Sequence, residues 1–431
     1  MKRTYLKRII NISRLSLITL ATLASQAYAA GYKLEMQSTS VLGDAGDAAV
    51  VEDAGTNWFN SAGLPYLPQQ LVVSAIDLYA PTTFSGTVIA PSVGSVFAGN
   101  GTASSHPNNV LPALHYSYPI NHKWAVGLSV APAWGFSENY GNTSVARYDL
   151  VYVNTTSIDI APSVAYKLNR NWSFGIGPDF HYFEVNSKTL DYLSPAFNGA
   201  SRYKTEDWGY GGHFGILYRL NDHTRIGLNY RSQIVMELND GFSDLSLPAA
   251  FSTFSGIPSA RSNAFKLRVT LPPTTTLSLY HDITPCWAVM GSIAYDQWSA
   301  LRYYYAQNYQ AAGVVVPVVY VPQFMSNTFD LGLGTHYKFN PEWMLRASVK
   351  YEPTPTKNAY RDINFPDGDK LGFQIGARYQ ITCKLALDML YGHVFVRTVP
   401  IGLTEPVTHV KVTGQNRTSV DLFGAQLVWN V

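Results

Sequence analysis

Charged residues, long apolar runs and cysteines are all scarce in this chain of 431 residues. Asp, Glu, Lys and Arg make up 14% of it, against about 25% in an average soluble protein. No apolar run reaches the roughly 20 residues that a helix needs to cross a bilayer, which excludes a helical membrane protein. Cysteine occurs only twice, at Cys286 and Cys383. This composition fits neither an ordinary soluble protein nor a helical membrane protein.

The sequence also lacks the motifs by which enzymes, metal sites and nucleotide-binding proteins are recognised. The ten histidines show no His-Glu-x-x-His spacing, and there is no phosphate-binding loop. Residues 127–131, Gly-Leu-Ser-Val-Ala, resemble a nucleophile elbow, but they lie within an expected strand and not at a strand-to-helix turn. We therefore expect no enzyme activity, no catalytic residues, no metal and no cofactor.

What the chain does contain is a regular succession of tight polar turns, each of which joins two runs of apolar residues alternating with small or polar ones. The six turns lie at residues 120–123, 168–171, 220–223, 282–285, 339–342 and 381–384. Between consecutive turns lies a long connection rich in Gly, Pro, Ser and Asn. Strands that cross a membrane up and down produce this alternation of short and long connections. Aromatic residues, at 13% of the chain, suit the two membrane interfaces.

The alternating runs predict an all-β fold, a 14-stranded antiparallel transmembrane β-barrel, because bacterial single-chain barrels have an even number of strands. The predicted strands are residues 71–80, 110–120, 122–136, 155–169, 171–187, 207–220, 222–236, 264–283, 286–301, 326–339, 342–352, 369–381, 384–396 and 417–430. In the fifth strand, Trp172 and Ile176 share the face expected to meet lipid, and Ser173 and Asp179 share the lumenal face. A soluble β-sandwich is the alternative, but minimal turns opposite long loops are not what a sandwich requires.

The first 29 residues have the pattern of a secretory signal peptide. Five basic residues precede an apolar stretch from Leu15 to Leu23, and Ala27-Tyr28-Ala29 follows as a cleavage site. Cleavage there would change the formal net charge from +2 to −3, because the five basic residues are lost. We expect export to the outer membrane of a Gram-negative bacterium. A nearly neutral mature chain also argues against nucleic acid as a partner.

The two cysteines fall in the fourth and sixth tight turns. About four strands at roughly 4.8 Å each separate these turns around the barrel wall, whereas a disulfide allows at most ~7 Å between Cα atoms. We predict that Cys286 and Cys383 are free thiols.

Residues 30–70 do not follow the strand pattern, and the barrel itself is expected at residues 71–431. Because 16–18 strands leave an open channel while about eight fill their own interior, fourteen should leave space. Residues 43–49 are small, and the stretch around Trp58 and Phe59 is apolar and costly to leave in water. We expect residues 30–70 to form an N-terminal plug, or hatch, inside the barrel; the alternative is a flexible periplasmic tail.

Two segments of this plug resemble a known hatch. Residues 40–45, Ser-Val-Leu-Gly-Asp-Ala, and 52–64, Glu-Asp-Ala-Gly-Thr-Asn-Trp-Phe-Asn-Ser-Ala-Gly-Leu, are similar to the N-terminus of FadL-type outer-membrane transporters of long-chain fatty acids, a family that includes aromatic-hydrocarbon transporters of the TodX type. Further matches lie at residues 271–273, 293–299, 365–370 and 421–424, so the resemblance covers essentially the whole mature chain. Asn60, Ser61 and Ala62 stand where the family usually has Asn-Pro-Ala.

The resemblance implies a route for the cargo. A hydrophobic molecule would enter from an external groove, bind in an internal pocket and leave sideways through a gap in the wall at a kinked third strand. Here the predicted third strand contains Pro132 and Gly135. Proline removes a donor from the strand ladder and glycine weakens pairing, so these two residues are candidates for the kink and the lateral opening. An ordinary barrel bulge is the alternative.

Candidate ligand-binding residues follow from strand parity and loop composition. A carboxylate-tipped cargo needs a basic partner in the lumen, although each base could instead pair with a lumenal acid. The candidate carboxylate partners are Arg225, Arg231, Arg346, Lys350 and Arg378, and Lys338 shares their face. The candidate apolar lining residues are Trp58 and Phe59 of the plug and Phe242, Leu245, Phe251 and Phe254 of the connection at 237–263. Exposed apolar surface marks binding sites, and mutual packing of loops into a lid is the alternative.

These observations favour passive uptake of a hydrophobic small molecule, with long-chain fatty acids ahead of monoaromatic hydrocarbons of the toluene or xylene type. A general porin, which the plug and the low charge disfavour, and a surface receptor, which the long loops allow, are the alternatives. The expected partners besides the cargo are outer-membrane lipid, lipopolysaccharide and the barrel-assembly machinery. We expect a monomer.

Overall fold

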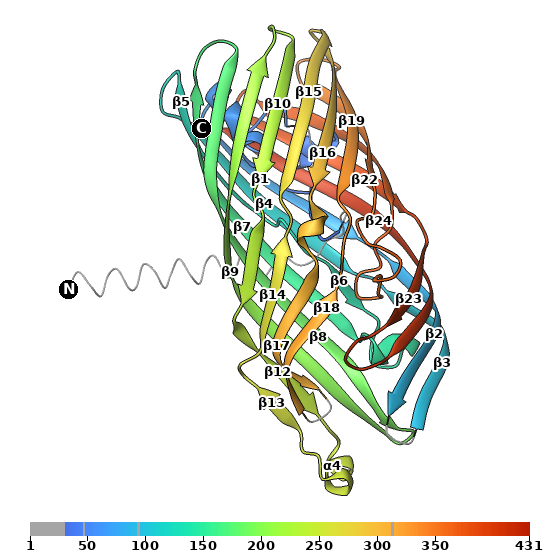
Figure 1. The fold of residues 1–431 in the computed structure, drawn as a ribbon. Coiled ribbons are helices and arrows are strands. Elements are labelled where there is room, and N and C mark those ends of the chain that lie inside the picture. The colour runs from blue at the N-terminus through green and yellow to red at the C-terminus, as the bar shows by residue number, and fades with distance from the viewer. Residues whose placement is uncertain (1–30, 46–47, 93–94, 312–313) are drawn as a thin grey trace, which may run out of the picture.

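The computed structural model describes residues 31–45, 48–92, 95–311 and 314–431, and these form one tall barrel (Figure 1). The expected signal peptide, residues 1–29, lies outside the described residues. Among the residues that are described, no helix is long and apolar enough to cross a membrane.

Fourteen antiparallel strand positions form the wall, as predicted, and pairing of the first with the last closes it, Gln70 opposite Asn430 through Tyr79 opposite Asp421. The uninterrupted positions are β1 (Gln70–Tyr79), β4 (Asn108–Pro119), β7 (Tyr152–Lys167), β8 (Trp172–Ser194), β9 (Phe197–Arg219), β20 (Trp343–Glu352), β21 (Lys370–Thr382), β22 (Leu385–Val396) and β24 (Lys411–Asn430). The other five are broken, namely β5 (Trp124–Ala131) with β6 (Ser137–Asn139), β10 (Thr224–Arg231) with β11 (Ile234–Leu238), β14 (Lys266–Leu271) with β15 (Thr274–Thr284), β16 (Trp287–Asp296) with β17 (Tyr303–Ala311), and β18 (Val314–Pro322) with β19 (Thr328–Lys338).

The six tight turns all lie at one end of the barrel, here called the turn end. All six are stabilised by a side-chain oxygen that accepts hydrogen bonds from backbone N–H groups. In the first turn Asn121 Oδ1 accepts hydrogen bonds from the backbone N–H groups of Lys123 and Trp124, at 2.8 and 2.9 Å. Asn169, Asn221, Thr284, Asn340 and Thr382 cap the other five turns in the same way. Asn and Thr side chains therefore fix the turns locally, because they replace a missing backbone partner.

Side-chain parity along the strands matches the prediction. In β8, Ile176 is 57% exposed whereas Asp179 is 2% exposed, and in β20 Leu345 is 50% exposed whereas Arg346 is 4% exposed. Trp124, Trp172 and Trp287 follow their turns and are exposed on the outer surface, where tryptophan suits the membrane interface. The outer face is therefore apolar and the lumenal face polar, as a membrane barrel requires.

The opposite end, here called the loop end, carries structure that the strand pattern did not predict. A hairpin of β2 (Thr82–Ser92) and β3 (Ser95–Ser105) extends the wall, and β12 (Asp240–Ser246), α4 (Ala249–Ser255), β13 (Ala260–Ser262) and β23 (Val399–Thr404) add to it (Figure 1). The fifth and sixth strands were predicted too short. β8 and β9 have 23 residues each, although about 9–11 suffice to cross a membrane. Their hairpin therefore projects beyond the bilayer.

Residues 31–45 and 48–67 fill the lumen near the turn end with short helices: α2 (Thr39–Gly43), α3 (Thr56–Asn60) and the 3-10 helix η1 (Ser61–Tyr66) (Figure 1). Ser38 caps α2 and Asn60 caps η1 through their side chains. This segment, here called the plug, hydrogen-bonds to strands on all sides, for example to Ser74, Ser129, Ser278 and Gln426. It is anchored around the whole circumference.

Candidate functional site

An ion-pair network holds the plug to the wall near the turn end. Arg346 of β20 donates to Asp44 at 2.7 Å, to Glu52 at 2.5 and 2.8 Å, and to Asp388 of β22 at 3.1 Å. Its side chain is 1% exposed. Because both plug carboxylates lie about 300 residues from Arg346 in sequence, these bonds tie the two ends of the chain together.

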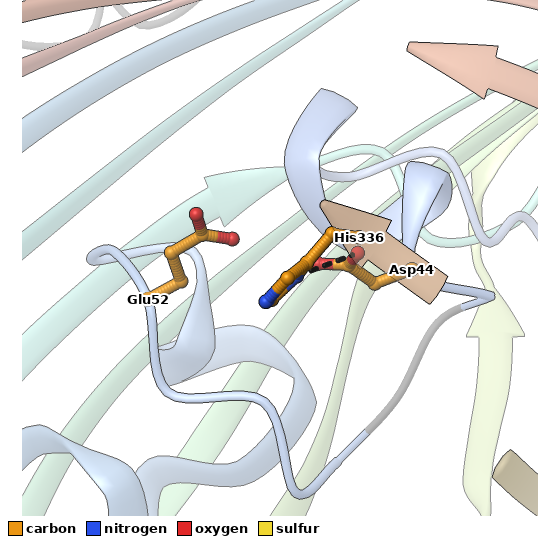
Figure 2. Close-up of side chains that lie close together, drawn as sticks. All are labelled: Asp44, Glu52 and His336. Atoms are coloured by element: carbon orange, nitrogen blue, oxygen red, sulfur yellow. Dashed lines mark ion pairs between the residues drawn. The ribbon is translucent and has the colours of Figure 1, made fainter. Parts of the chain in front are cut away.

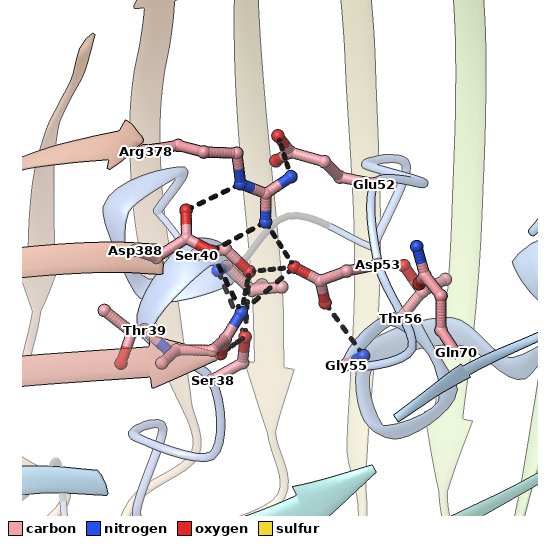
Figure 3. Close-up of polar contacts among 12 residues, drawn as sticks. Ser38, Thr39, Ser40, Glu52, Asp53, Gly55, Thr56, Gln70, Arg378 and Asp388 are labelled. Carbon is pink, nitrogen blue, oxygen red and sulfur yellow. Dashed lines mark hydrogen bonds and ion pairs between the residues drawn. The ribbon is translucent and has the colours of Figure 1, made fainter. Parts of the chain in front are cut away.

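Arg378 of β21 extends the same network (Figure 3). Its guanidinium donates to Glu52 at 2.8 Å, to Asp53 at 2.9 Å and to Asp388 at 2.7 and 2.9 Å. Asp53 in turn accepts hydrogen bonds from Ser40 of the plug and from Gln426 of β24. Arg346 and Arg378, two candidate carboxylate partners, are thus bonded to acids of the protein itself.

Asp44, Glu52 and His336 come close enough together to hold a metal ion (Figure 2). Arg346 already donates to both carboxylates, and His336 Nδ1 lies 3.6 Å from Asp44 Oδ1. The guanidinium supplies the positive charge that a cation would bring, so the cluster acts as an anchor of the plug.

A small cavity of about 90 Å³, here called the inner cavity, lies between the plug and the wall. It brings together four residues that the sequence singled out: Trp58 and Phe59 of α3, Arg231 at the end of β10, and Lys350 of β20. Arg231 donates to the backbone oxygen of Trp58 at 3.1 Å and forms an ion pair with Asp179 at 3.0 Å. Its guanidinium carbon lies 3.8 Å from the centre of the Trp58 ring.

The other bases of the inner cavity are also paired. Lys33 Nζ lies 2.5 Å from Asp296 and 2.8 Å from Glu35, and Lys350 contacts Glu35 and, at 3.0 Å, Glu352. Every basic side chain that lines this cavity therefore has a carboxylate partner within the described chain. A cargo carboxylate would have to compete with one of these acids.

A second cavity of about 210 Å³, here called the outer cavity, lies at the loop end and is mostly apolar. Its aromatic walls include Phe136, Phe183, Tyr203, Phe265 and Tyr304. Tyr32 of the plug lines it too, and packs against Phe136 at 5.2 Å and Trp298 at 5.7 Å between ring centres. Since Lys33 and Leu34 line the inner cavity, the start of the plug separates the two cavities.

Three carboxyls, those of Asp149, Asp362 and Glu405, also line the outer cavity. Burial, together with the nearby Asp362, raises the pKa of the Glu405 carboxyl to about 8. Burial and the two neighbouring acids likewise raise the pKa of Asp149. Burial also raises the pKa of Asp362. The described residues that line the cavity include no Lys, Arg or His.

The third strand position is broken where Pro132 and Gly135 lie. β5 ends at Ala131, and β6 begins at Ser137 and pairs with β7 alone. Instead of a wall strand, the plug meets the intervening segment: Leu34 N–H donates to Ala133 O at 2.8 Å and Gly135 N–H donates to Tyr32 O at 2.9 Å. β5 therefore ends before the predicted strand end at residue 136, and a role of Pro132 and Gly135 in a lateral opening stays a prediction.

This break leaves one edge of the wall open. β5 pairs with β4 only from Leu114 to Pro119, so residues 108–113 have no partner in β5. A polar cavity of about 560 Å³, here called the wall gap, lies between the edges and is lined by Asn108 and Asn109 on one side and Ser137 and Glu138 on the other. The segment 132–139 thus touches all three cavities, because Ala133 lines the inner cavity and Phe136 the outer one.

The hatch tripeptide, which lacks the family's proline, forms a turn held by hydrogen bonds of Asn60. Asn60 accepts a hydrogen bond from Ala62 N–H at 3.1 Å and donates to Ala48 O and to Ile216 O of β9. A Cβ placed on Gly215 would lie 2.1 Å from Asn60 Oδ1, so only glycine allows the wall to approach this turn.

The remaining candidates lie outside the three cavities. Arg225 stacks on Tyr280 at 3.9 Å, and Phe242 lies under Arg261 at 3.7 Å. Leu245 is buried in β12, Phe251 packs near Phe197, and Phe254 is 90% exposed on α4. For these residues a role in binding stays a prediction. Strand parity missed Lys33, Tyr32, Asp149, Asp362 and Glu405, since all five lie in plug or loop segments without a period.

Comparison with known proteins agrees with this geometry. Residues 20–430 match the family model described as outer membrane protein transport protein (OMPP1/FadL/TodX). The chain belongs to this family. The family consists of outer-membrane transporters and not enzymes, and together with the barrel it places the chain in the Gram-negative outer membrane.

Individual members of the OMPP1/FadL/TodX family align over most of the chain. The long-chain fatty acid transport protein of Salmonella typhi is 27% identical over 409 residues, 89% of this chain and 92% of that one. Outer membrane protein P1 of Haemophilus influenzae is 26% identical over 86% of this chain and 87% of that protein. Among solved structures, a Pseudomonas aeruginosa FadL homologue superposes with a TM-score of 0.82 at 20% identity over 93% of this chain and 100% of its own. The Pseudomonas putida toluene transporter TodX gives 0.67 at 16% identity, over 94% of this chain and 100% of its own.

Proposed function

We propose that this protein carries hydrophobic small molecules passively across the outer membrane, with long-chain fatty acids as its main cargo. The observation that supports this best is the broken third strand. Its residues 132–139 line the outer cavity, the inner cavity and the wall gap. One segment thus connects a binding chamber at the loop end with an opening in the side of the barrel. The relatives named as long-chain fatty acid transport proteins support the choice of cargo.

In this proposal the cargo enters at the loop end, and part of its apolar chain lodges among the aromatic walls of the outer cavity. It passes the ring of Tyr32 into the inner cavity and leaves through the wall gap into the lipid. No step needs energy input, because an apolar molecule gains by leaving water at each stage. The plug, anchored by Arg346 and Arg378, keeps the axial path towards the turn end closed. We also propose that the protein is a monomer that contacts outer-membrane lipid and lipopolysaccharide. The barrel-assembly machinery would insert it into the membrane.

Arg231 is the base best placed for a fatty-acid carboxylate. Its side chain is 17% exposed, whereas that of Arg346 is 1% exposed, and it faces the inner cavity beside the apolar rings of Trp58 and Phe59. A carboxylate can replace Asp179 as its partner while the acyl chain stays on those rings.

Monoaromatic hydrocarbons are the second candidate cargo. An engineered apolar cavity of about 150 Å³ holds benzene, so the outer cavity of about 210 Å³ is large enough for a toluene-sized ring. A neutral ring also avoids competition with the acids that pair with every base of the inner cavity.

Uptake of labelled oleate and labelled toluene would separate the two cargoes. Cells that lack their own transporter would express this chain, or a version without residues 31–67 as a control for nonspecific leakage. We expect oleate uptake by the complete chain. Toluene uptake without oleate uptake would reverse the order of the candidates, and uptake of neither would contradict the proposed transport. A plugged barrel should also give little ion conductance in a planar bilayer, unlike a general porin.

A further inference from the structure

The outer cavity combines two features that no fatty-acid site requires: aromatic walls and three carboxyls, with no basic residue in its described lining. Asp149 follows the 3-10 helix η2 (Val145–Tyr148), Asp362 lies in the connection before β21, and Glu405 lies in the connection before β24. All three line the same cavity, where Asp362 and Glu405 raise the pKa of Asp149 and Asp362 also raises that of Glu405. Three separate loops bring acid to one apolar chamber.

Asp149 is the most unusual of the three. It is only 6% exposed, and neither of its carboxylate oxygens has a hydrogen-bond partner in the described structure. By contrast, Asp362 accepts a hydrogen bond from Phe365 N–H at 2.8 Å. Buried acceptors are almost always satisfied, so an orphaned carboxyl that lines a cavity indicates a donor missing from the structure.

Two arginines that lie close to the cluster in sequence, Arg147 and Arg361, are bonded elsewhere. Arg147 of η2 donates to Ser144 O at 2.7 Å and stacks on the rings of Phe97 and Tyr148. Arg361 donates to the backbone oxygens of Asp367 and Thr356, both at 2.8 Å. The described side chains thus leave the Asp149 carboxyl available to a donor on a ligand.

We propose that the outer cavity binds hydrophobic amines in their ammonium form, with the apolar body against the aromatic walls and the nitrogen on Asp149, flanked by Asp362 and Glu405. An ammonium group offers three N–H donors, and aromatic faces attract cations. A carboxylate in the same position would be a buried charge without a basic partner in the described lining, which is unfavourable. An alcohol could donate one bond but would not neutralise the cluster.

The size of the cavity limits the body of the ligand. The volume of the outer cavity, about 210 Å³, is larger than the roughly 150 Å³ that holds benzene. The difference leaves room for a short side chain on the ring. A single ring with a two-carbon chain to the amine therefore fits, and 2-phenylethylamine is a suitable probe. This is a further binding activity and does not depend on the proposed uptake of fatty acids.

Binding of a cation here should release protons. The pKa of Glu405, about 8, keeps this carboxyl mostly protonated at neutral pH, burial raises the pKa values of Asp149 and Asp362 as well, and an ammonium ion favours the ionised form of each. The phenols of Tyr140, Tyr203, Tyr304 and Tyr309, which stay uncharged at neutral pH, also face the cluster. Tyr32 and Tyr148 line the same cavity. Amine affinity should therefore rise as the pH increases from 6 to 8.

The test compares three probes of one shape: 2-phenylethylamine, 2-phenylethanol and phenylacetate. Calorimetry on the complete chain in zwitterionic lipid nanodiscs, with empty nanodiscs subtracted, should give amine binding at least about tenfold tighter than that of the alcohol, and no binding of phenylacetate. In wild type, repeating the titration in two buffers of different ionisation enthalpy should reveal proton release with the amine only.

Asp149→Asn should weaken amine binding about tenfold or more and leave the alcohol unchanged. Asp222→Asn, at a tight turn where the side chain is 96% exposed, is the matched control and should change neither. Equal affinity for amine and alcohol, absence of proton release, or unchanged amine binding in Asp149→Asn would each overturn the proposal. The wild-type measurements decide it even if the variant fails to fold, and none of these outcomes bears on oleate uptake.

Discussion

The guanidinium carbon of Arg231 lies 3.8 Å from the centre of the Trp58 ring, and the same guanidinium donates to the backbone oxygen of Trp58 at 3.1 Å. One residue belongs to the wall and the other to the plug. The wall and the plug therefore form the inner cavity together, and any shift of the plug alters the environment of Arg231. Because Arg231 is the last residue of β10, just before the strand is interrupted, its side chain reaches the plug without distorting a regular ladder.

Asp179→Asn should increase the affinity for oleate. It removes the acid that lies 3.0 Å from Arg231 and still accepts the hydrogen bond from His213. A hydrogen bond to a charged group contributes about 1.5–3 kcal/mol, so we expect oleate to bind roughly tenfold or more tightly. Fluorescence titration with labelled fatty acid measures this, and oleyl alcohol should show no gain.

Arg225→Gln is the matched control for this test, since Arg225 stacks on Tyr280 outside the three cavities. It should leave oleate affinity unchanged. An equal gain for oleyl alcohol would show that Asp179 acts through packing and not by occupying Arg231.

Arg346→Met should loosen the plug. The substitution leaves Asp44 without its strongest partner and weakens the pairing of Glu52 and Asp388. Breaking a buried ion pair by removing one partner costs about 3–5 kcal/mol. We expect higher single-channel conductance in planar bilayers and easier unfolding of the plug in urea.

Arg397→Met serves as the control, because its pair with Asp369 is on the surface and the arginine side chain is 76% exposed. An exposed pair contributes about 0–1 kcal/mol. If Arg346→Met conducted no more than Arg397→Met, the network would not be what holds the plug.

Strand parity was enough to predict the barrel wall. A period of two assigns each side chain to lipid or lumen, and polar turns limit the register, so Leu345 and Arg346 could be placed on opposite faces without a structure. The loop end was not predictable in this way. Residues 82–105 and 240–262 are rich in Gly, Ser and Thr and carry no clear period, although they form further strands.

The candidate site was only partly predictable for a related reason. Strand parity correctly placed Arg231 and Lys350 in the lumen, but it does not predict which carboxylate forms an ion pair with each of them. The pairing of Arg346 with Glu52 spans 294 residues and depends on how the plug is rotated inside the barrel. The end of β5 at Ala131 was the exception, since Pro132 and Gly135 are residues that weaken a strand ladder and can be read from the sequence itself.

The two cysteines can be used to determine which side of the outer membrane the turn end of the barrel faces. Both are free and exposed, as predicted, and both lie at the turn end. Short turns face the periplasm in bacterial barrels, so a membrane-impermeant maleimide should label neither in intact cells and both after the outer membrane is opened. Labelling of intact cells would invert the topology.

The loop around Glu405 should lose stability as the pH rises. An ordinary glutamate ionises near pH 4.5 in the unfolded chain, whereas the folded carboxyl has a pKa of about 8. Between these values the folded state holds the extra proton, so its stability is complete below about pH 4.5 and declines up to about pH 8. Hydrogen exchange of residues 405–410, corrected for intrinsic rates, should show more opening at pH 8.5 than at pH 6. Glu405→Gln should reduce this difference, and an undiminished difference would contradict the assignment to Glu405.

Sideways exit through the wall gap is tested most directly by closing it reversibly. Asn139 N–H donates to Ser105 Oγ at 2.7 Å, so cysteines at these two positions span the edges that a departing acyl chain must separate. In a Cys286→Ser/Cys383→Ser background, the oxidised Ser105→Cys/Asn139→Cys chain should take up labelled oleate at least about tenfold more slowly than its reduced form. The Ser105→Cys single variant should not respond to oxidant. Equal oleate uptake by the oxidised and reduced double-cysteine chains would contradict lateral release at this gap.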